Sequence, residues 1–343
     1  MKKSTIVLST ILVANMSLSA NTDKLITKAH NAGLKSIPTS QLELYKIIDN
    51  KTNKITKDKV ELGKKLFFEP RLSKSGLISC NTCHNLGMGG VDGVGAATGH
   101  KWTANPAHLN SPTVYNAVFN DSQFWDGRSP DLEDQAQGPM QAGPEMAAPK
   151  KLVESRVNSM PAYVAEFKNA YGQDVNIDFK IITETIGLFE RTLVTPSRFD
   201  KFLDGDSNAL TKDEKKGLNI FIDKGCTACH TGIGMGGTMQ PFPVVNSYKY
   251  ENVGGFTGDK NKMVKTPTLR NIEETAPYFH NGAIWSLSEA VKEMGSTQLG
   301  IKLSDHDTKY IVKFLKSLTG DKGDISYPQL PARTNSTPKP DMK

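Results

Sequence analysis

Two short segments of this 343-residue chain repeat one pattern of cysteine and histidine. The chain has four cysteines, and all of them fall in these segments, Cys80-Asn-Thr-Cys83-His84 and Cys226-Thr-Ala-Cys229-His230. The pattern C-x-x-C-H is the attachment signature of c-type haem, in which both thiols become thioethers to the porphyrin and the histidine binds the iron. The sequence therefore predicts two covalently bound haems.

Two other uses of paired cysteines fit the chain less well. A zinc ribbon places its two C-x-x-C pairs about 15–20 residues apart, whereas 142 residues separate Cys83 from Cys226. Disulfides form in an oxidising compartment, but they would leave the matched histidines His84 and His230 without a role. Export agrees with the haem interpretation, because c-type haem is attached outside the cytoplasm.

Residues 1–20 have the order of a secretory signal peptide. Lys2 and Lys3 precede a short apolar run, and small residues follow it. A retained membrane anchor is the alternative, although the run is shorter than the ~20 apolar residues of a spanning helix. The formal net charge is +6 without any concentrated basic segment, so the composition gives no reason to expect nucleic-acid binding. We expect a cleaved, exported and soluble protein.

A longer internal repeat surrounds the two motifs. Residues 111–116, SPTVYN, match residues 266–271, TPTLRN, and the segment FWDG at 124–127 matches FHNG at 279–282. Both pairs share an offset of 155 residues. Upstream, Gly63-x-x-x-Phe67 and Gly217-x-x-x-Phe221 each fall on an expected helix that leads to a C-x-x-C-H motif. The repeat predicts two similar haem-binding units in one chain.

The coarse pattern of the chain is mainly α-helical. Apolar residues recur at helical spacing over 177–193, which should form a long helix ending before Pro196. Thr211 and Glu214 form a capping box for a helix in the second unit. We therefore expect two cytochrome-c-like helical domains with one haem each, followed by a surface tail: 21–194, 195–325 and 326–343.

Each six-coordinate iron needs a second axial ligand. His100 follows His84 by 16 residues across a glycine-rich loop, so it can bind the distal face of the first iron or merely touch the haem edge. His280 lies in a YFHNG turn and should pack near a haem without binding iron. The remaining histidines are expected at the surface: His30, His108 and His306.

The second unit has no histidine at the position of His100, so a methionine is expected there. The candidates are Met235, Met239, Met263 and Met294. The 155-residue offset aligns Met294 with Pro139, in a segment that follows the repeated block of the first unit, and Met294 is therefore preferred. A histidine–methionine pair would raise the reduction potential of its haem, because the soft thioether favours ferrous iron.

The chain resembles the bacterial dihaem cytochrome c peroxidases over residues 40–325. The resemblance is carried by SCNTCHNLGMGGVDG, TGHKW, NSPTVYNAVFNDSQFWDGRSPDLEDQAQGPMQAGPEM and KTPTLRNIEETAPYFHNGA. It implies a two-domain, mainly helical fold with two c haems, which reduces hydrogen peroxide to water in the periplasm. Electrons would come from a small donor such as cytochrome c, and the expected assembly is a homodimer.

The resemblance also implies the iron ligands. His84 would be the proximal ligand of a low-potential, peroxide-reacting haem, and His100 its displaceable distal ligand. His230 and Met294 would bind the high-potential haem that receives electrons. Reduction of the second haem would release His100 and open the first.

Further site residues follow from the same resemblance. Gln135 and Glu145 match the distal pocket, and Trp125 falls where the family has a tryptophan between the haems. An interdomain calcium site would use Asn110, Thr275 and Pro277. Beside a haem, Glu145 can move a proton between the two peroxide oxygens as a general acid–base, while Gln135 orients peroxide by hydrogen bonding. The simpler alternatives are a solvated surface acid for Glu145 and pure packing for Trp125.

Two other functions remain compatible with the motifs. A dihaem electron carrier would keep both irons six-coordinate after one-electron reduction. A relative of the methylamine dehydrogenase maturation enzyme would oxidise side chains of a partner protein, although that group has a tyrosine where Met294 stands here.

Overall fold

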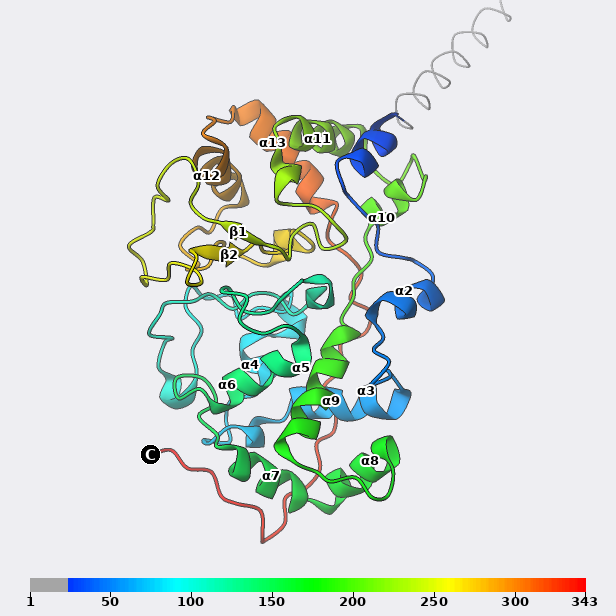
Figure 1. Ribbon diagram of the computed structural model, residues 1–343, viewed down its shortest axis with the longest axis vertical. Helices are drawn as coiled ribbons and strands as arrows, with labels where there is room; N and C mark the ends of the chain where they lie inside the picture. Colours follow the sequence, from blue (N-terminus) through cyan, green and yellow to red (C-terminus); the bar gives the residue numbers. More distant parts are fainter. Residues whose placement is uncertain (1–23) are drawn as a thin grey trace, which may run out of the picture.

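The computed structural model describes residues 24–343 as two helical domains stacked along the long axis of the molecule (Figure 1). The expected signal peptide at residues 1–20 lies outside this described part. Within residues 24–343, no helix has both the length and the apolar character needed to cross a membrane. A mainly helical fold with two cytochrome-c-type domains is confirmed.

The regular elements are short and mostly helical. Residues 24–31 form the first described helix. The other α-helices are α2 (Gln41–Ile48), α3 (Lys57–Phe67), α4 (Cys80–Cys83), α5 (Leu132–Gln135), α6 (Gln137–Gln141), α7 (Lys150–Asn158), α8 (Pro161–Tyr171), α9 (Phe179–Arg191), α10 (Arg198–Leu203), α11 (Lys212–Asp223), α12 (Leu287–Leu299) and α13 (Asp305–Lys316). The 3₁₀ helices are η1 (Pro70–Leu72), η2 (Leu86–Met88), η3 (His100–Trp102), η4 (Ala117–Phe119), η5 (Cys226–Ala228) and η6 (Ile272–Glu274). Strands β1 (Met239–Pro241) and β2 (Met263–Lys265) form one antiparallel pair.

The N-terminal domain is built on the crossing of α3 and α9. The predicted helix at 177–193 is confirmed as α9, and the side chain of Asp178 caps its start by accepting from the amide of Ile181 at 2.9 Å. Gly63 of α3 lies directly against the backbone of Thr185, so any β-carbon there would collide with a carbonyl oxygen. The absence of a side chain allows the two helices to approach closely.

The C-terminal domain repeats this crossing with α11 and α13. Thr211 and Glu214 form the predicted capping box at the start of α11, where the amide of Thr211 donates to Glu214 at 2.7 Å. Gly217 faces the backbone of Tyr310 on α13, as Gly63 faces α9 in the first domain. The same sequence pattern thus produces the same helix contact twice.

The internal repeat is also visible around the domain junction. Asn116 and Asn271, which are related by the 155-residue offset, both adopt left-handed backbone angles with φ of 63° and 60°. Each donates its side-chain amide to the hydroxyl of Thr195, at 2.8 and 2.9 Å. Thr195 is fully buried, so one residue between the domains satisfies the equivalent asparagine of both.

Two main-chain hydrogen bonds cross the interface in the same symmetric way. The amide of Asn110 donates to the carbonyl of His280, and the amide of Lys265 donates to the carbonyl of Trp125, both at 2.8 Å. Lys265 and His280 are the repeat counterparts of Asn110 and Trp125 at the 155-residue offset. The two domains therefore meet through equivalent surfaces.

The chain ends depart from the expected domain limits. We expected residues 21–194 to form the N-terminal domain, but residues 24–37 pack on the C-terminal domain because Ala29 and Leu34 are buried in its core. The two cores otherwise divide between Leu193 and Phe199, near the expected boundary.

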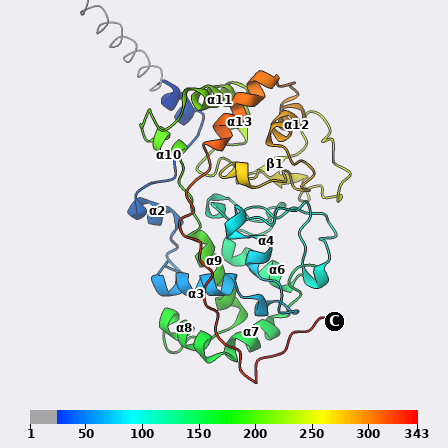
Figure 2. The ribbon, with the colours of Figure 1, turned by 180° about the vertical axis from the view of Figure 1, so that it is seen from behind.

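The expected surface tail at 326–343 is an ordered strap along the N-terminal domain, as the two opposite views show (Figures 1 and 2). Tyr327 accepts a hydrogen bond from Asn81 at 2.8 Å. The buried guanidinium of Arg156 donates to the carbonyls of Pro338 and Lys339 at 3.2 and 2.9 Å. Because the guanidinium of Arg156 binds these two backbone carbonyls, the strap is held on the surface of the N-terminal domain.

The helix contact at Gly217 gives a stability prediction. Gly217→Ala should lower the free energy of unfolding of the haem-loaded protein by about 1–3 kcal/mol, since the new methyl group overpacks the crossing. Gly143→Ala is a matched control, because a β-carbon there meets no atom within 4 Å, and it should change stability by less than about 0.5 kcal/mol. Denaturant unfolding measures both, and an equal effect of the two substitutions would contradict the packing argument.

Candidate functional site

Each C-x-x-C-H motif opens onto its own cavity. The first cavity lies in the N-terminal domain and is lined by Cys80, Cys83 and His84 together with apolar residues. The second lies in the C-terminal domain and is lined by Cys226, Cys229 and His230. The structure therefore brings each motif histidine together with its two cysteines at the edge of an apolar hollow.

The two motif histidines are oriented in the same manner. Nδ1 of His84 lies 2.9 Å from the carbonyl oxygen of Pro112, and Nδ1 of His230 lies 3.1 Å from that of Met235. A carbonyl oxygen can only accept, so Nδ1 carries the proton in both rings. Burial lowers the pKa of His84, and it lowers the pKa of His230 to about 4. Neutral imidazoles held by Nδ1 present Nε2 as the metal-binding nitrogen.

The four cysteines are free thiols in the structure. Burial raises the pKa of Cys83 to about 12 and that of Cys226 to about 11, so both thiols are neutral. Within residues 24–343, no group of three or more His, Cys, Asp or Glu side chains could hold a metal ion. The structure thus supports neither the disulfide nor the zinc alternative. Paired thiols, a neutral histidine and an apolar cavity fit a covalently attached haem.

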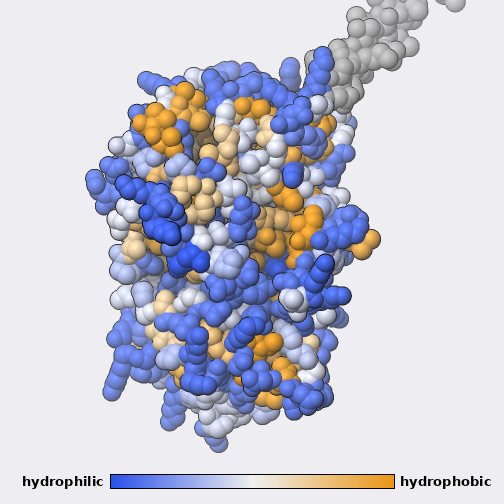
Figure 3. Space-filling view, viewed as in Figure 1, coloured by the Kyte–Doolittle hydropathy of each residue, from blue (hydrophilic) through white to orange (hydrophobic). Residues whose placement is uncertain are grey.

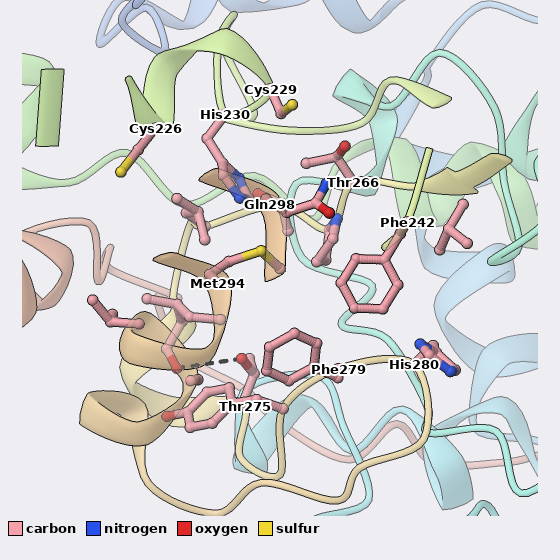
Figure 4. A pocket seen from close by; sticks show the side chains of 18 of the residues that line it. Cys226, Cys229, His230, Phe242, Thr266, Thr275, Phe279, His280, Met294 and Gln298 are labelled. Atoms are coloured by element: carbon pink, nitrogen blue, oxygen red, sulfur yellow. Dashed lines mark hydrogen bonds between the residues drawn. The ribbon is translucent and has the colours of Figure 1, made fainter. Parts of the chain in front are cut away.

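The structure separates the four methionine candidates of the second cavity. Met294, on α12, lines this cavity together with His230, and both side chains project into the same space in Figure 4. Met235 is fully buried in the core, while Met239 and Met263 belong to the two strands. Of these four methionines, Met294 alone lines the cavity. Its role as an iron ligand stays a prediction.

The first cavity also contains the predicted carboxyl and amide. Gln135, at the end of α5, and Glu145, in the turn after α6, both line it. Burial raises the pKa of Glu145, and the positive charge of Arg128 partly opposes this shift. Arg128 is held by Asp126 at 2.8 Å, and its guanidinium lies 3.5 Å from the centre of the Phe124 ring.

His100 lies next to Glu145 without lining the first cavity in the part of the chain that the structure describes. Its backbone amide donates to the carbonyl of Glu145 at 2.7 Å, and its buried Nδ1 has no hydrogen-bond partner among the described residues. Lys101 and Trp102 follow with φ of 60° and 56°. Left-handed angles at two successive non-glycine residues are unfavourable by about 1–3 kcal/mol each. The segment around His100 is therefore strained.

Trp125 and His280 lie at the boundary of the two domains. Trp125 lines both cavities, and its indole Nε1 donates to the carbonyl of Asn110 at 2.9 Å. Its ring centre is 6.3 Å from that of His280. Burial lowers the pKa of His280 to about 4, and the ring lines the second cavity as expected of a packed histidine. Of the histidines expected at the surface, His30 and His306 are exposed and His108 is half-buried.

The residues expected to bind calcium come from both domains. The side-chain amide of Asn110 lies 2.7 Å from the carbonyl oxygen of Pro277, and Thr275 precedes Pro277 by two residues. Hard cations such as Ca²⁺ take oxygen ligands from amide side chains and backbone carbonyls. The structure thus brings Asn110 and Pro277 together, and the ion itself stays a prediction.

Three charged residues near the cavities were missed in the sequence. Arg128 and Glu190 line the first cavity, and Lys265 lines both. Burial and then the charge of Glu133 raise the pKa of Glu190 to about 8. The sequence offers one signal for Lys265, because this residue is the repeat counterpart of Asn110 at the 155-residue offset. Nothing in the local sequence distinguishes Glu190 from an exposed helix residue.

Two family models together match most of the residues that the structure describes. Residues 57–208 match the model of the di-haem cytochrome c peroxidases, and residues 214–319 match that of cytochrome c. The cytochrome c551 peroxidase of Nitrosomonas europaea is 49% identical over 82% of this chain and 86% of its own length. The cytochrome c551 peroxidase of Pseudomonas aeruginosa is 44% identical over 97% of both chains.

The chain belongs to the dihaem cytochrome c peroxidase family. It is therefore an oxidoreductase of that family with two c-type haems, one in each domain. A methylamine utilization protein of Methylorubrum extorquens is more distant, at 34% identity over 82% of this chain and 84% of its own length. A solved structure of a MauG-like protein associated with microbial copper homeostasis has the same fold, with a TM-score of 0.70 at 24% identity over 79% of this chain and 92% of that one.

The choice of Met294 over the other methionines can be tested by spectroscopy. Met294→Leu should abolish the methionine-to-iron charge-transfer band of the oxidised protein and lower the potential of the C-terminal haem, because the thioether ligand is lost. Met263→Leu, which changes a strand residue, should leave both unchanged. Loss of the band in Met263→Leu, or its persistence in Met294→Leu, would exclude the assignment.

Proposed function

We propose that this peroxidase reduces hydrogen peroxide to water in the periplasm, with electrons from a small donor protein such as cytochrome c. Each peroxide takes up two electrons and two protons and yields two water molecules. The observation that carries the proposal is the pairing of Glu145 and Gln135 in the cavity that also contains His84. A bound haem supplies the iron centre at which the O–O bond is reduced.

Glu145 is suited to move the proton that peroxide cleavage requires. In its ionised form the carboxylate accepts a proton from one peroxide oxygen and then returns it to the other, which leaves as water. Its raised pKa brings it closer to neutral pH, where both directions of transfer are efficient. Gln135 can hold peroxide by hydrogen bonding without changing the charge of the pocket.

Electrons enter, in this proposal, through the C-terminal domain. Val244 and Val245 are 55% and 56% exposed, and Val245 is hydrogen-bonded to Thr297 of α12, the helix that carries Met294. Figure 3 shows apolar side chains gathered on the surface over α12. A small apolar patch of this kind suits the brief contacts of electron-transfer partners. Trp125, which lines both cavities, lies on the path from one domain to the other.

His100 acts in the proposal as a displaceable ligand. The structure places His100 beside Glu145 and outside the lining of the first cavity, so the proposal requires its segment to move inward for His100 to bind the iron, and to move out again once the C-terminal domain has received an electron. The strained residues Lys101 and Trp102 support this role, because relief of left-handed angles lowers the free energy needed to rearrange the segment.

The same proposal includes a homodimer, which light scattering on the purified protein measures directly.

The role of Glu145 predicts the effect of its replacement. Glu145→Gln with both haems attached should lower kcat for peroxide by about 10²–10⁴-fold, since the general acid–base is lost while size is kept. Steady-state oxidation of reduced cytochrome c measures this. Glu43→Gln, at an exposed carboxylate on α2, is a control and should keep normal turnover. Normal turnover in Glu145→Gln would refute the mechanism.

The pH profile should respond to Arg128. Because Glu145 must be ionised to accept a proton, activity should fall as the pH drops through its raised pKa. Arg128 stabilises the ionised form, so Arg128→Gln should raise the pKa further and move the acidic limb of kcat to higher pH. A profile measured on both proteins that shows no shift, or a shift to lower pH, would contradict this electrostatic coupling.

We also propose that calcium binds between the domains at Asn110, Thr275 and Pro277. The amide of Asn110 would turn so that its oxygen, together with the carbonyls of the other two residues, faces the ion. Asn110→Ala should weaken calcium affinity by about tenfold or more, measured by titration calorimetry on the chelator-treated holoprotein. Asn208→Ala, at an exposed turn, should bind as the wild type does, and unchanged affinity in Asn110→Ala would exclude this site.

A further inference from the structure

Lys265 is a buried cation at the junction of the two cavities. It ends strand β2 opposite Met239, its residue is only 4% exposed, and its backbone amide is bonded to Trp125 across the interface. It lines the cavity of the N-terminal domain as well as that of its own domain. A long side chain from one domain therefore reaches both haem sites.

The ammonium group of Lys265 has no partner among the described residues. No ion pair or side-chain hydrogen bond joins it to residues 24–343, and Asp126, whose negative charge acts on Lys265, is engaged by Arg128 at 2.8 and 2.9 Å. Burial lowers the pKa of Lys265 to about 8, and Asp126 opposes this only in part. A buried charge is stable when a counter-ion accompanies it, so we expect an anion to bind beside the Lys265 ammonium.

The internal repeat relates Lys265 to a residue of the N-terminal domain. Lys265 is the counterpart of Asn110, the proposed calcium ligand, at the 155-residue offset. Each residue donates its backbone amide across the interface at 2.8 Å. One half of the pseudo-symmetric interface thus offers a place for a metal cation, and the other half offers the ammonium of Lys265.

We propose that Lys265 binds a carboxylate of the haem in the N-terminal domain and so joins the two domains through that haem. The inference rests on the presence of two c-type haems. Each haem carries two propionate groups, and these are the anions that a loaded cavity brings to its edge. An ammonium from the neighbouring domain would hold such a carboxylate by a charge-assisted hydrogen bond.

The lining of the first cavity indicates which haem is concerned. Among the described residues of the C-terminal domain, Phe256 and Lys265 line this cavity, and of the two only Lys265 carries a charge. Lys265 thus brings a cation from the neighbouring domain to the N-terminal haem site. A positive charge near an iron favours the reduced state, so Lys265 should raise the potential of the N-terminal haem more than that of the other.

The test is redox titration of the haem-loaded protein with spectroscopic detection of each haem. Lys265→Met removes the charge but keeps a long apolar side chain. It should shift the one-electron reduction equilibrium of the N-terminal haem at least tenfold toward the oxidised form, which corresponds to about 59 mV. Lys260→Met removes an exposed lysine from the loop before β2 and should leave both potentials unchanged.

Further variants keep the test decisive. Lys265→Arg retains the charge and should keep the wild-type potential, whereas a shift as large as that of Lys265→Met would indicate packing alone and overturn the proposal. Lys265→Gln provides the neutral variant if Lys265→Met loses haem. Unchanged potentials in a neutral variant with both haems bound would also overturn it. A wild-type potential that depends on added chloride or phosphate would assign Lys265 to a free anion instead.

This experiment is independent of peroxide turnover. Shifted potentials in a protein that fails to reduce peroxide would refute the proposed function and leave the role of Lys265 intact. Normal turnover with unshifted potentials would refute the role of Lys265 alone. Resonance Raman spectra of the propionate bending modes add a direct readout, because these modes should change in Lys265→Met and stay unchanged in Lys260→Met.

Discussion

Two main-chain hydrogen bonds across the domain interface hold together the residues that lie between the two haem cavities. They fix Asn110 against His280 and Lys265 against Trp125. Because each bond uses backbone atoms, its geometry does not depend on which side chains the two halves have acquired. The side chains at equivalent positions differ around this constant frame, because Trp125 corresponds to His280 and Asn110 corresponds to Lys265. The two domains thus share one backbone arrangement at the interface but carry different side chains at equivalent positions.

Much of this arrangement could be predicted from the sequence. The two C-x-x-C-H motifs define the haem sites, and the 155-residue offset identifies equivalent residues before any coordinates are known. The helices α9 and α11 follow from apolar periodicity and from the capping box at Thr211. The repeat also favoured Met294, the one of the four candidate methionines that lines the second cavity. These features are encoded by local spacing, which is why a single chain reveals them.

Other features depend on contacts between distant segments. Glu190 reads as an ordinary helix residue, yet the packing of α9 buries it beside the first cavity. The polar composition of residues 326–343 gives no hint that Arg156 is buried and able to bind their carbonyls. The helix at 24–31 joins the far domain because its apolar side chains find a core there. Such outcomes are decided by tertiary burial, which a linear pattern does not contain.

The path of the chain limits how the two domains can move. Within residues 24–343 it crosses between them three times: after residue 37, near Thr195, and again before the C-terminal strap. Three covalent connections at separate points allow small tilts of one domain against the other and oppose separation or wide rotation. The proposed coupling between the two haem sites would therefore operate through short displacements of loops at the interface. Neither half, cut out at residue 195, would retain all the segments that complete its own surface.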